Sequence, residues 1–188
     1  MSEHDRGKAA YEADQLKQAQ ERHEAINETY RFLFGESPLH LIFMDTEGAN
    51  PTRDGWSLRE FGAVDFITRR TFHGIDSLQD TFERFWRWLN DLGLGRLVFV
   101  TDNIAYDWPP IHWHMVKYFG TNPFGHSARR IGDFYAGLVG DWRKGSEWKS
   151  LRVTPHDHNP VNDAMGNVEA FAAMLEGKRG KKRGRRYG

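Results

Sequence analysis

Two short apolar runs constrain the fold of this chain more than any other feature. They are residues 39–44 (LHLIFM) and residues 97–101 (LVFVT). Each run has the length of a strand and is apolar at successive positions, which is typical of a strand that is buried on both faces. An acidic residue follows each run directly, Asp45 after the first and Asp102 after the second.

The segments around these runs predict the rest of the domain. Turn residues between positions 50 and 55 end the first strand region. Periodicity then predicts strands at 58–66 and 68–74, and helices at 78–92, 109–119, 132–138 and 161–175. The order of three strands, a helix, a strand and further helices predicts an α/β fold with a mixed sheet, whose first strands form an antiparallel meander.

Two polar segments flank this region. Residues 5–34 predict a helix, because apolar residues recur there at spacings of three to five, and Gly35 ends it. Residues 177–188 (GKRGKKRGRRYG) contain seven basic residues and no acidic one. We therefore expect an N-terminal helical extension over residues 1–37, one domain over 38–176, and a basic, disordered tail over 177–188.

The formal net charge of zero conceals an asymmetry between body and tail. Seven of the 26 basic residues lie in the tail, which leaves 19 basic against 26 acidic residues in the body, a net charge of −7. A tail of +7 favours phosphate binding that does not depend on sequence, and a nuclear import signal is the alternative.

Composition excludes several classes of protein. The chain has no cysteine, which excludes disulfide scaffolds, thiol catalysis and cysteine-based zinc sites. No apolar run approaches the roughly 20 residues of a membrane span, and the polar N-terminus is unlike a secretory signal. We expect a soluble, cytoplasmic protein without membrane partners.

Carboxylates gather where strands end or helices begin. Asp45 and Glu47 follow the first apolar run, and residues i and i+2 of an extended chain point to the same face. Two carboxylates held this near to each other repel unless a cation lies between them. Asp107 follows the second run, where an acid can also serve simply to begin a helix.

A third group, residues 158–163 (HNPVND), begins the last predicted helix. Asn159 suits the N-cap and Pro160 the first helical position. His158 and Asp163 then occupy the two positions that face each other in a hydrophobic staple. A solvated, polar helix start is the alternative interpretation of this group.

Together these residues suggest metal-dependent hydrolysis. Oxygen ligands without cysteine favour Mg²⁺ or Mn²⁺ over zinc. Two such ions can clamp the attacking and leaving oxygens of a phosphodiester, and a nearby histidine can take a proton from water.

The ordered motifs IFMDTEG, NIAYD and HNPVNDA resemble those of the DEDDh 3′–5′ exonucleases over residues 38–176. The resemblance implies an RNase H-like fold, in which a mixed β-sheet is flanked by helices, and a two-metal phosphodiesterase that releases nucleoside 5′-monophosphates. It implies four metal ligands and a histidine that acts as general base: Asp45, Glu47, Asp107, Asp163 and His158. It also allows a homodimer.

Two features depart from the family pattern. Many relatives have a histidine where this chain has Asp102. Pro109 and Pro110 follow Asp107 closely, and a residue before proline is biased away from helix. We therefore expect the helix start to be displaced at this point.

Substrate contacts are expected near the first two motifs. Trp56 and Phe61 could stack on a 3′-terminal base, and the backbone at Thr46 and Gly48 could approach the terminal nucleotide, with Asn103 of the second motif nearby. As a small stand-alone chain, the protein resembles the members of the family that act on RNA or short oligonucleotides, and this resemblance favours single-stranded RNA over DNA as substrate.

Two other functions stay open. His156-x-His158 and His112-x-His114 could together bind zinc in a hydrolase, although the sequence His-x-His-x-Asp-His is not met. A nucleic-acid-binding or scaffold protein built on an inactive nuclease fold is the other alternative.

Overall fold

A computed structural model of the chain describes residues 39–75, 77–93 and 95–180, together with six residues between positions 14 and 28. The chain divides into two compact units, residues 1–36 with 175–188, and residues 37–174. The expected helix over 5–34 lies largely outside the described residues, and the six that are described there are helical. No helix among the described residues is long and apolar enough to cross a membrane.

The second unit is built on a five-stranded mixed sheet with the order β5-β4-β1-β6-β7. β1 is antiparallel to β4 and β4 to β5, whereas β1, β6 and β7 are parallel. The strands are β1 (Leu39–Glu47), β4 (Glu60–Asp65), β5 (Thr71–Gly74), β6 (Arg96–Thr101) and β7 (Ala128–Arg130). The mixed sheet with an antiparallel meander is thus confirmed, and β7 is a strand that the sequence did not reveal.

β1 is the centre of the sheet, and its two faces meet different helices. Ile42 and Met44 point into a core cluster with side chains of the helices on one face. Phe43 points to the other face, where its ring lies 5.4 Å from that of Phe171. Both faces are therefore buried, which explains why the run is apolar at successive positions.

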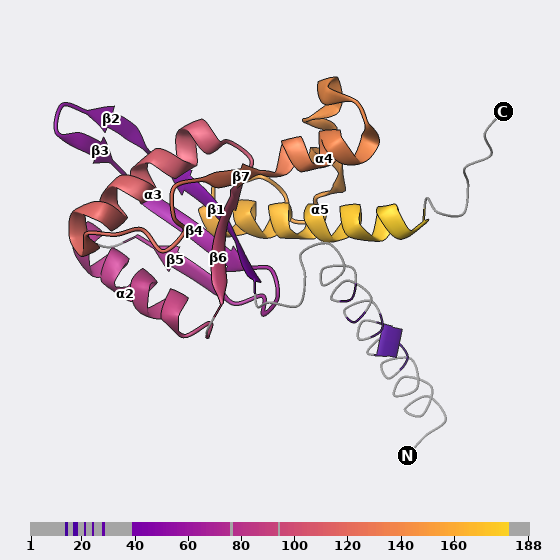
Figure 1. The fold of residues 1–188 in the computed structure, drawn as a ribbon, viewed down its shortest axis with the longest axis horizontal. Coiled ribbons are helices and arrows are strands. Elements are labelled where there is room, and N and C mark those ends of the chain that lie inside the picture. Colours follow the sequence, from indigo (N-terminus) through magenta and orange to yellow (C-terminus); the bar gives the residue numbers. More distant parts are fainter. Residues whose placement is uncertain are drawn as a thin grey trace, which may run out of the picture. The chain divides into compact units, whose positions relative to one another are not determined.

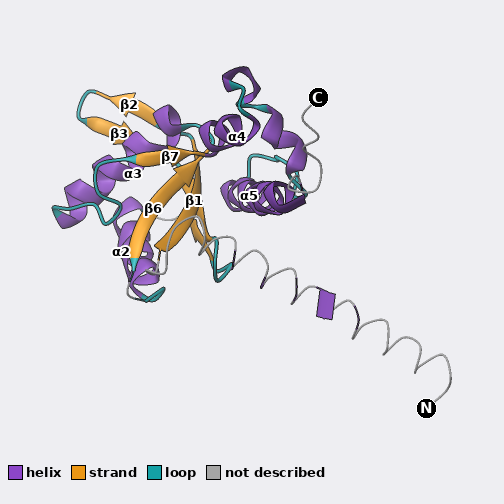
Figure 2. Ribbon diagram, turned by 45° about the vertical axis from the view of Figure 1, so that its right-hand side comes forward, coloured by secondary structure: helices purple, strands orange, loops and turns teal. Residues whose placement is uncertain are grey.

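Helices cover the two faces of the sheet (Figures 1 and 2). They are α2 (Leu78–Asn90), α3 (Ile104–Phe119), α4 (Ile131–Val139) and α5 (Pro160–Gly180). Phe82 and Phe85 of α2 and Ile111 and Met115 of α3 belong to the core cluster of Ile42 and Met44. α5 continues to Gly180, so the first residues of the expected tail are helical.

The start of α3 differs from the sequence prediction. The helix begins at Ile104, five residues before the expected position 109, and contains Pro109 and Pro110. The carbonyl of Asn103 accepts hydrogen bonds from the N–H groups of Tyr106 and Asp107, both at 3.0 Å. The expectation that the prolines displace the helix start is wrong. The hydrogen bonds to Asn103 form the first helical turn before either proline is reached.

A small hairpin, β2 (Asn50–Thr52) and β3 (Gly55–Ser57), occupies the segment expected to be only a turn. It packs on α3, and a Cβ built at Gly55 would lie 2.1 Å from the Trp113 ring. Gly55 has a φ of 133°, which other residues rarely adopt. The hairpin therefore depends on a contact between segments that are distant in sequence.

Candidate active site

The carboxylates singled out in the sequence converge at one end of the sheet. Oxygens of Asp45, Glu47 and Asp163 lie within 4.8 Å of one another, and so do oxygens of Asp45, Asp102 and Asp107. Asp45 belongs to both groups, so it joins them into one cluster. The cluster draws on the end of β1, the loop after β6, the first turn of α3 and the first turn of α5.

The alternation of β1 explains how its residues reach two helices. Asp45 is two residues after Phe43, so both side chains point to the face of the sheet that α5 covers. Thr46 is two residues after Met44 and points to the opposite face. Thr46 accordingly contacts α3: its N–H and its hydroxyl donate to Asp107 Oδ1 at 3.0 and 2.8 Å. The hydroxyl of Thr101 at the end of β6 donates to Asp107 Oδ2. Asp107 is therefore held in place on both oxygens, and it is only 1% exposed.

The glycine opposite Asp45 allows α5 to approach the sheet. Gly62 of β4 is the cross-strand partner of Asp45, so both lie on the same face. A Cβ at Gly62 would lie 2.3 Å from the backbone carbonyl of Pro160, the first residue of α5. The missing side chain thus lets the helix start come close to the sheet, next to Asp45, and Asp163 lies in that first turn.

The electrostatics of this cluster favour a bound cation. Burial, with the nearby charges of Asp107 and Asp163, raises the pKa of Asp45 to about 9. Burial also raises the pKa of Asp107 to about 6, although its hydrogen bonds from Thr101 and Thr46 act in the opposite direction. A divalent cation would stabilise the ionised carboxylates, and an all-oxygen donor set suits Mg²⁺ or Mn²⁺. The residues present therefore fit such a metal.

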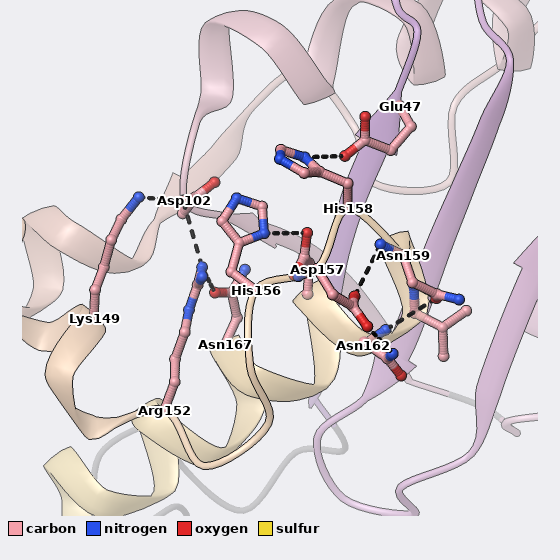
Figure 3. Close-up of polar contacts among 12 residues, drawn as sticks. Glu47, Asp102, Lys149, Arg152, His156, Asp157, His158, Asn159, Asn162 and Asn167 are labelled. Atoms are coloured by element: carbon pink, nitrogen blue, oxygen red, sulfur yellow. Dashed lines mark hydrogen bonds and ion pairs between the residues drawn. The ribbon is translucent and has the colours of Figure 1, made fainter.

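The N-terminus of α5 is capped as expected, but the two histidines before it differ from expectation. Asn159 Oδ1 accepts hydrogen bonds from the N–H groups of Val161 and Asn162 at 3.0 and 3.3 Å. His156 Nδ1, however, is the group that lies 2.5 Å from Asp163 Oδ2. His158 Nδ1 instead lies 3.2 Å from Glu47 Oε1 (Figure 3). His158 and Asp163 do lie close together, with ligand atoms within 4.8 Å, but the nearest polar partner of His158 is Glu47 and that of Asp163 is His156.

The backbone conformation of His158 is unusual at this position. His158 has a φ of 62°, in the left-handed region that non-glycine residues seldom occupy. With this backbone conformation the His158 ring lies beside Glu47 of β1, while it stays within 4.8 Å of an Asp163 oxygen. The side chain is 76% exposed, so it is open to solvent and to a substrate.

Basic residues approach the cluster at Asp102. Lys149 Nζ lies 2.9 Å and Arg152 Nη2 3.5 Å from Asp102 Oδ2 (Figure 3). Arg152 also donates to Asn167 Oδ1 of α5 at 2.5 Å and packs over the Trp148 ring. The segment before the histidines is thereby tied both to the end of β6 and to α5.

Two expected substrate contacts are not available. Phe61 is completely buried in the core, with its ring 5.0 Å from that of Phe85, so it cannot stack on a base. Phe61 pairs with Thr46 across the strands and therefore shares its inward face. Thr46 uses its N–H and hydroxyl on Asp107, so it positions a carboxylate rather than contacting a nucleotide through them.

The other three expected contacts lie near the surface. Trp56 is half-buried in the hairpin, Asn103 is exposed at the start of α3, and Gly48 adopts a φ of 66° directly after β1. A Cβ at Gly48 would lie 2.7 Å from that of Arg59, so the turn requires glycine.

The zinc site of four histidines, left open as an alternative, does not form among the described residues. Three groups of candidate ligands occur there, and none includes His112 or His114. His114 is buried beside Phe82 and Tyr118, and burial lowers its pKa to about 4. His112 contacts Asn122 instead.

Sequence reasoning missed the roles of several residues around the cluster. Asp102 and His156 had detectable signals, namely the position after a buried strand and the His-x-His spacing. Lys149 and Arg152 had none, because they lie in an irregular segment with two short 3₁₀ turns, Trp142–Lys144 and Glu147–Leu151.

Comparison with known proteins finds similarity to nucleases in part of the sequence and in the fold. No protein-family profile matches the chain. It is 31% identical over 105 residues to the 3′-5′ DNA exonuclease Cap18 of Escherichia coli, covering 52% of this chain and 56% of Cap18. This sequence match supports the resemblance to 3′–5′ exonucleases that the motifs indicated.

Two solved structures are similar in fold. The cell-death related nuclease 4 (CRN-4) matches with a TM-score of 0.55 and 15% identity over 73% of this chain and 64% of that chain. The nuclease domain of 3′hExo, a DEDDh family member bound to rAMP, matches with a TM-score of 0.40 and 14% identity over 77% and 92%. The mixed sheet flanked by helices is thus the nuclease fold of CRN-4, as expected. The chain spans less than two thirds of the length of Cap18 or of the CRN-4 chain.

Proposed function

We propose that this chain is a metal-dependent 3′–5′ exonuclease of the DEDDh type. One observation carries the proposal: Asp45, Asp107 and Asp163, from three distant segments, meet with Glu47 at one end of the sheet, and His158 adjoins them. The sequence match to a 3′–5′ DNA exonuclease supports the direction of attack.

Asp45, Glu47, Asp107 and Asp163 would hold two Mg²⁺ or Mn²⁺ ions. When bound, such ions neutralise charge on the reacting phosphate and make a water molecule more acidic. The hydrogen bonds from Thr46 and Thr101 fix the orientation of the Asp107 carboxylate before any ligand arrives. Pre-ordered ligands bind more tightly because less conformational freedom is lost on binding.

His158 would act as general base toward the attacking water. Its Nδ1 faces the Glu47 carboxylate, and in the tautomer that donates Nδ1–H to Glu47 the free nitrogen, Nε2, can accept a proton. Its exposure leaves Nε2 accessible to the water and the substrate. Glu47 would thus both bind metal and orient the base.

The substrate in this proposal is a single strand with a free 3′ end. The turn at Gly48 and the half-buried Trp56 would contact its terminal nucleotide. The resemblance to small stand-alone family members favours RNA, but the sequence relative is named for DNA, which supports DNA as a substrate as well. The RNA preference, cytoplasmic action and a homodimer remain predictions.

A hydrolysis assay tests this function. Single strands of RNA and of DNA, labelled at the 5′ or the 3′ end, are incubated with the full chain in Mg²⁺ or Mn²⁺. We expect shortening from the 3′ end, release of nucleoside 5′-monophosphates, and loss of hydrolysis in EDTA. His158→Ala should lower turnover much more than it lowers metal affinity.

Asp45→Ala and Asp163→Ala should abolish hydrolysis, whereas Asp54→Ala, in the exposed β2–β3 turn, should not. Hydrolysis that persists in both active-site variants would refute the proposal. Strand binding without hydrolysis under every metal condition would instead favour the scaffold alternative.

A further inference from the structure

Two histidines and a carboxylate form a second group of possible ligands, which overlaps the carboxylate cluster at Asp163. The rings of His156 and His158 lie with their centroids 4.6 Å apart, and His156 Nδ1 lies 2.5 Å from Asp163 Oδ2. One ligand atom from each of the three residues lies within 4.8 Å of the others. We infer that His156, His158 and Asp163 form an inhibitory site for zinc or a similar transition metal.

The donor set distinguishes this site from the carboxylate cluster. Two imidazole nitrogens and one carboxylate oxygen suit Zn²⁺, and three protein ligands leave a position for water. Mg²⁺ prefers oxygen ligands and has little affinity for imidazole. The two groups of ligands therefore select different ions, although they share Asp163.

The segment that carries the histidines is ordered before any metal binds. Asp157 accepts hydrogen bonds from the N–H of Asn159 at 3.0 Å and from the Asn162 side chain at 2.8 Å. The N–H of Asp157 donates to Asp163 Oδ1 at 3.3 Å. The Asp157 carboxylate is thus bound to Asn159 and Asn162, as Figure 3 shows. The backbone between the two histidines is held on Asp163.

The segment is also anchored further upstream. Glu169 of α5 accepts hydrogen bonds from the N–H groups of Val153 and Thr154 and from the Thr154 hydroxyl, at 3.1, 2.6 and 2.9 Å. His156 and His158 are exposed, whereas Asp163 is buried. A metal ion can thus enter from solvent and needs only small side-chain movements to gain all three ligands.

Inhibition follows from the residues that the two sites share, and this step rests on the proposed function. A metal on His156, His158 and Asp163 would occupy the imidazole proposed as general base. It would also withdraw an Asp163 oxygen from the carboxylate group that includes Asp45 and Glu47. Zinc should therefore inhibit hydrolysis even when Mg²⁺ is in large excess.

Metal binding is measured first, without reference to activity. The untagged full chain is stripped of metal and titrated with Zn²⁺ by calorimetry and with Co²⁺ by visible absorption. His156→Gln should weaken zinc binding at least tenfold, whereas His156→Cys, which keeps a zinc ligand, should retain it. Glu47→Gln removes a carboxylate of the other group and should leave the nitrogen-ligated Co²⁺ spectrum in place.

His126→Gln, at another exposed histidine, is the matched control and should bind zinc like the unmodified chain. Zinc binding unchanged by His156→Gln would overturn the inference and leave the proposed exonuclease intact. Zinc binding that depends on His156 in a chain without hydrolysis would support the site and refute the exonuclease. In an active chain, His156→Gln should raise the zinc concentration for half-inhibition at least tenfold.

Discussion

Thr46 and Asp107, which are 61 residues apart in the sequence, are joined by two hydrogen bonds to one carboxylate oxygen. The N–H of Thr46 lies 3.0 Å and its hydroxyl 2.8 Å from Asp107 Oδ1. The residue between the two acids of the first motif thus orients the acid of the second motif. The tripeptide Asp45-Thr46-Glu47 therefore provides two carboxylates of the cluster and orients the third, that of Asp107.

Replacement of Thr46 by valine should weaken metal binding while the fold is retained. Valine keeps the size and β-branching of threonine but removes the hydroxyl donor to Asp107, which costs about 1.5–3 kcal/mol for a bond to a charged group. We expect Mn²⁺ affinity, measured by calorimetry, to fall by about 10- to 100-fold. Thr71→Val at an exposed position of β5 is the control, and equal losses in both variants would contradict this role.

Alanine at Gly62 should separate α5 from the sheet. The added Cβ would meet the Pro160 backbone at 2.3 Å, so the helix start and Asp163 would have to move away from Asp45. We expect a loss of about 1–3 kcal/mol in the free energy of unfolding, together with loss of hydrolysis. Gly137→Ala in α4 has no atom within 4 Å of its Cβ and should leave stability unchanged or raise it.

Asp45→Asn should stabilise the metal-free chain at neutral pH. The pKa of Asp45 is about 9 in the folded state and near 3.8 in the unfolded state, so folding takes up a proton between these values. The contribution of Asp45 to the free energy of unfolding is fully present below about pH 4 and is lost as the pH rises toward 9. Asparagine carries no charge and should remove that loss, raising the Tm in EDTA by at least about 2–4 °C at pH 8.

With added Mg²⁺ the unmodified chain should have the higher Tm of the two. Mg²⁺ stabilises it by binding the ionised carboxylates and leaves Asp45→Asn unaffected. Asp54→Asn, in the exposed β2–β3 turn, serves as the control for a change of charge alone. A Tm of Asp45→Asn equal to that of the unmodified chain in EDTA at pH 8 would show that Asp45 carries no such electrostatic cost.

Removal of residues 181–188 should affect substrate binding and not chemistry. This cut spares α5, which continues to Gly180, and removes five basic residues. We expect KM for single strands to rise and its dependence on salt to decrease, while kcat stays the same. A Gly/Ser segment of equal length is the control, and a fall in kcat at saturating substrate would assign the tail a role in turnover.

Local patterns in the sequence were sufficient for the main elements. The apolar run before Asp45 predicted β1, and the Asn-Pro pair predicted the start of α5, because burial of a strand and capping of a helix depend on neighbouring residues. The same local reasoning failed at Pro109, where the closure of the first turn on Asn103 allowed the helix to begin earlier than expected.

Local sequence patterns were enough to identify the residues available for chemistry: four acids after strands or at helix starts, and two histidines before the last helix. The partners of these residues depend on how the chain folds. His156 is the nearest polar partner of Asp163, whereas His158, with its left-handed backbone, has Glu47 as its nearest partner, 111 residues away. Phe61 lies in the core rather than at the substrate, because its pairing with Thr46 turns it inward. Periodicity and capping act over a few residues, whereas these contacts depend on how distant segments pack.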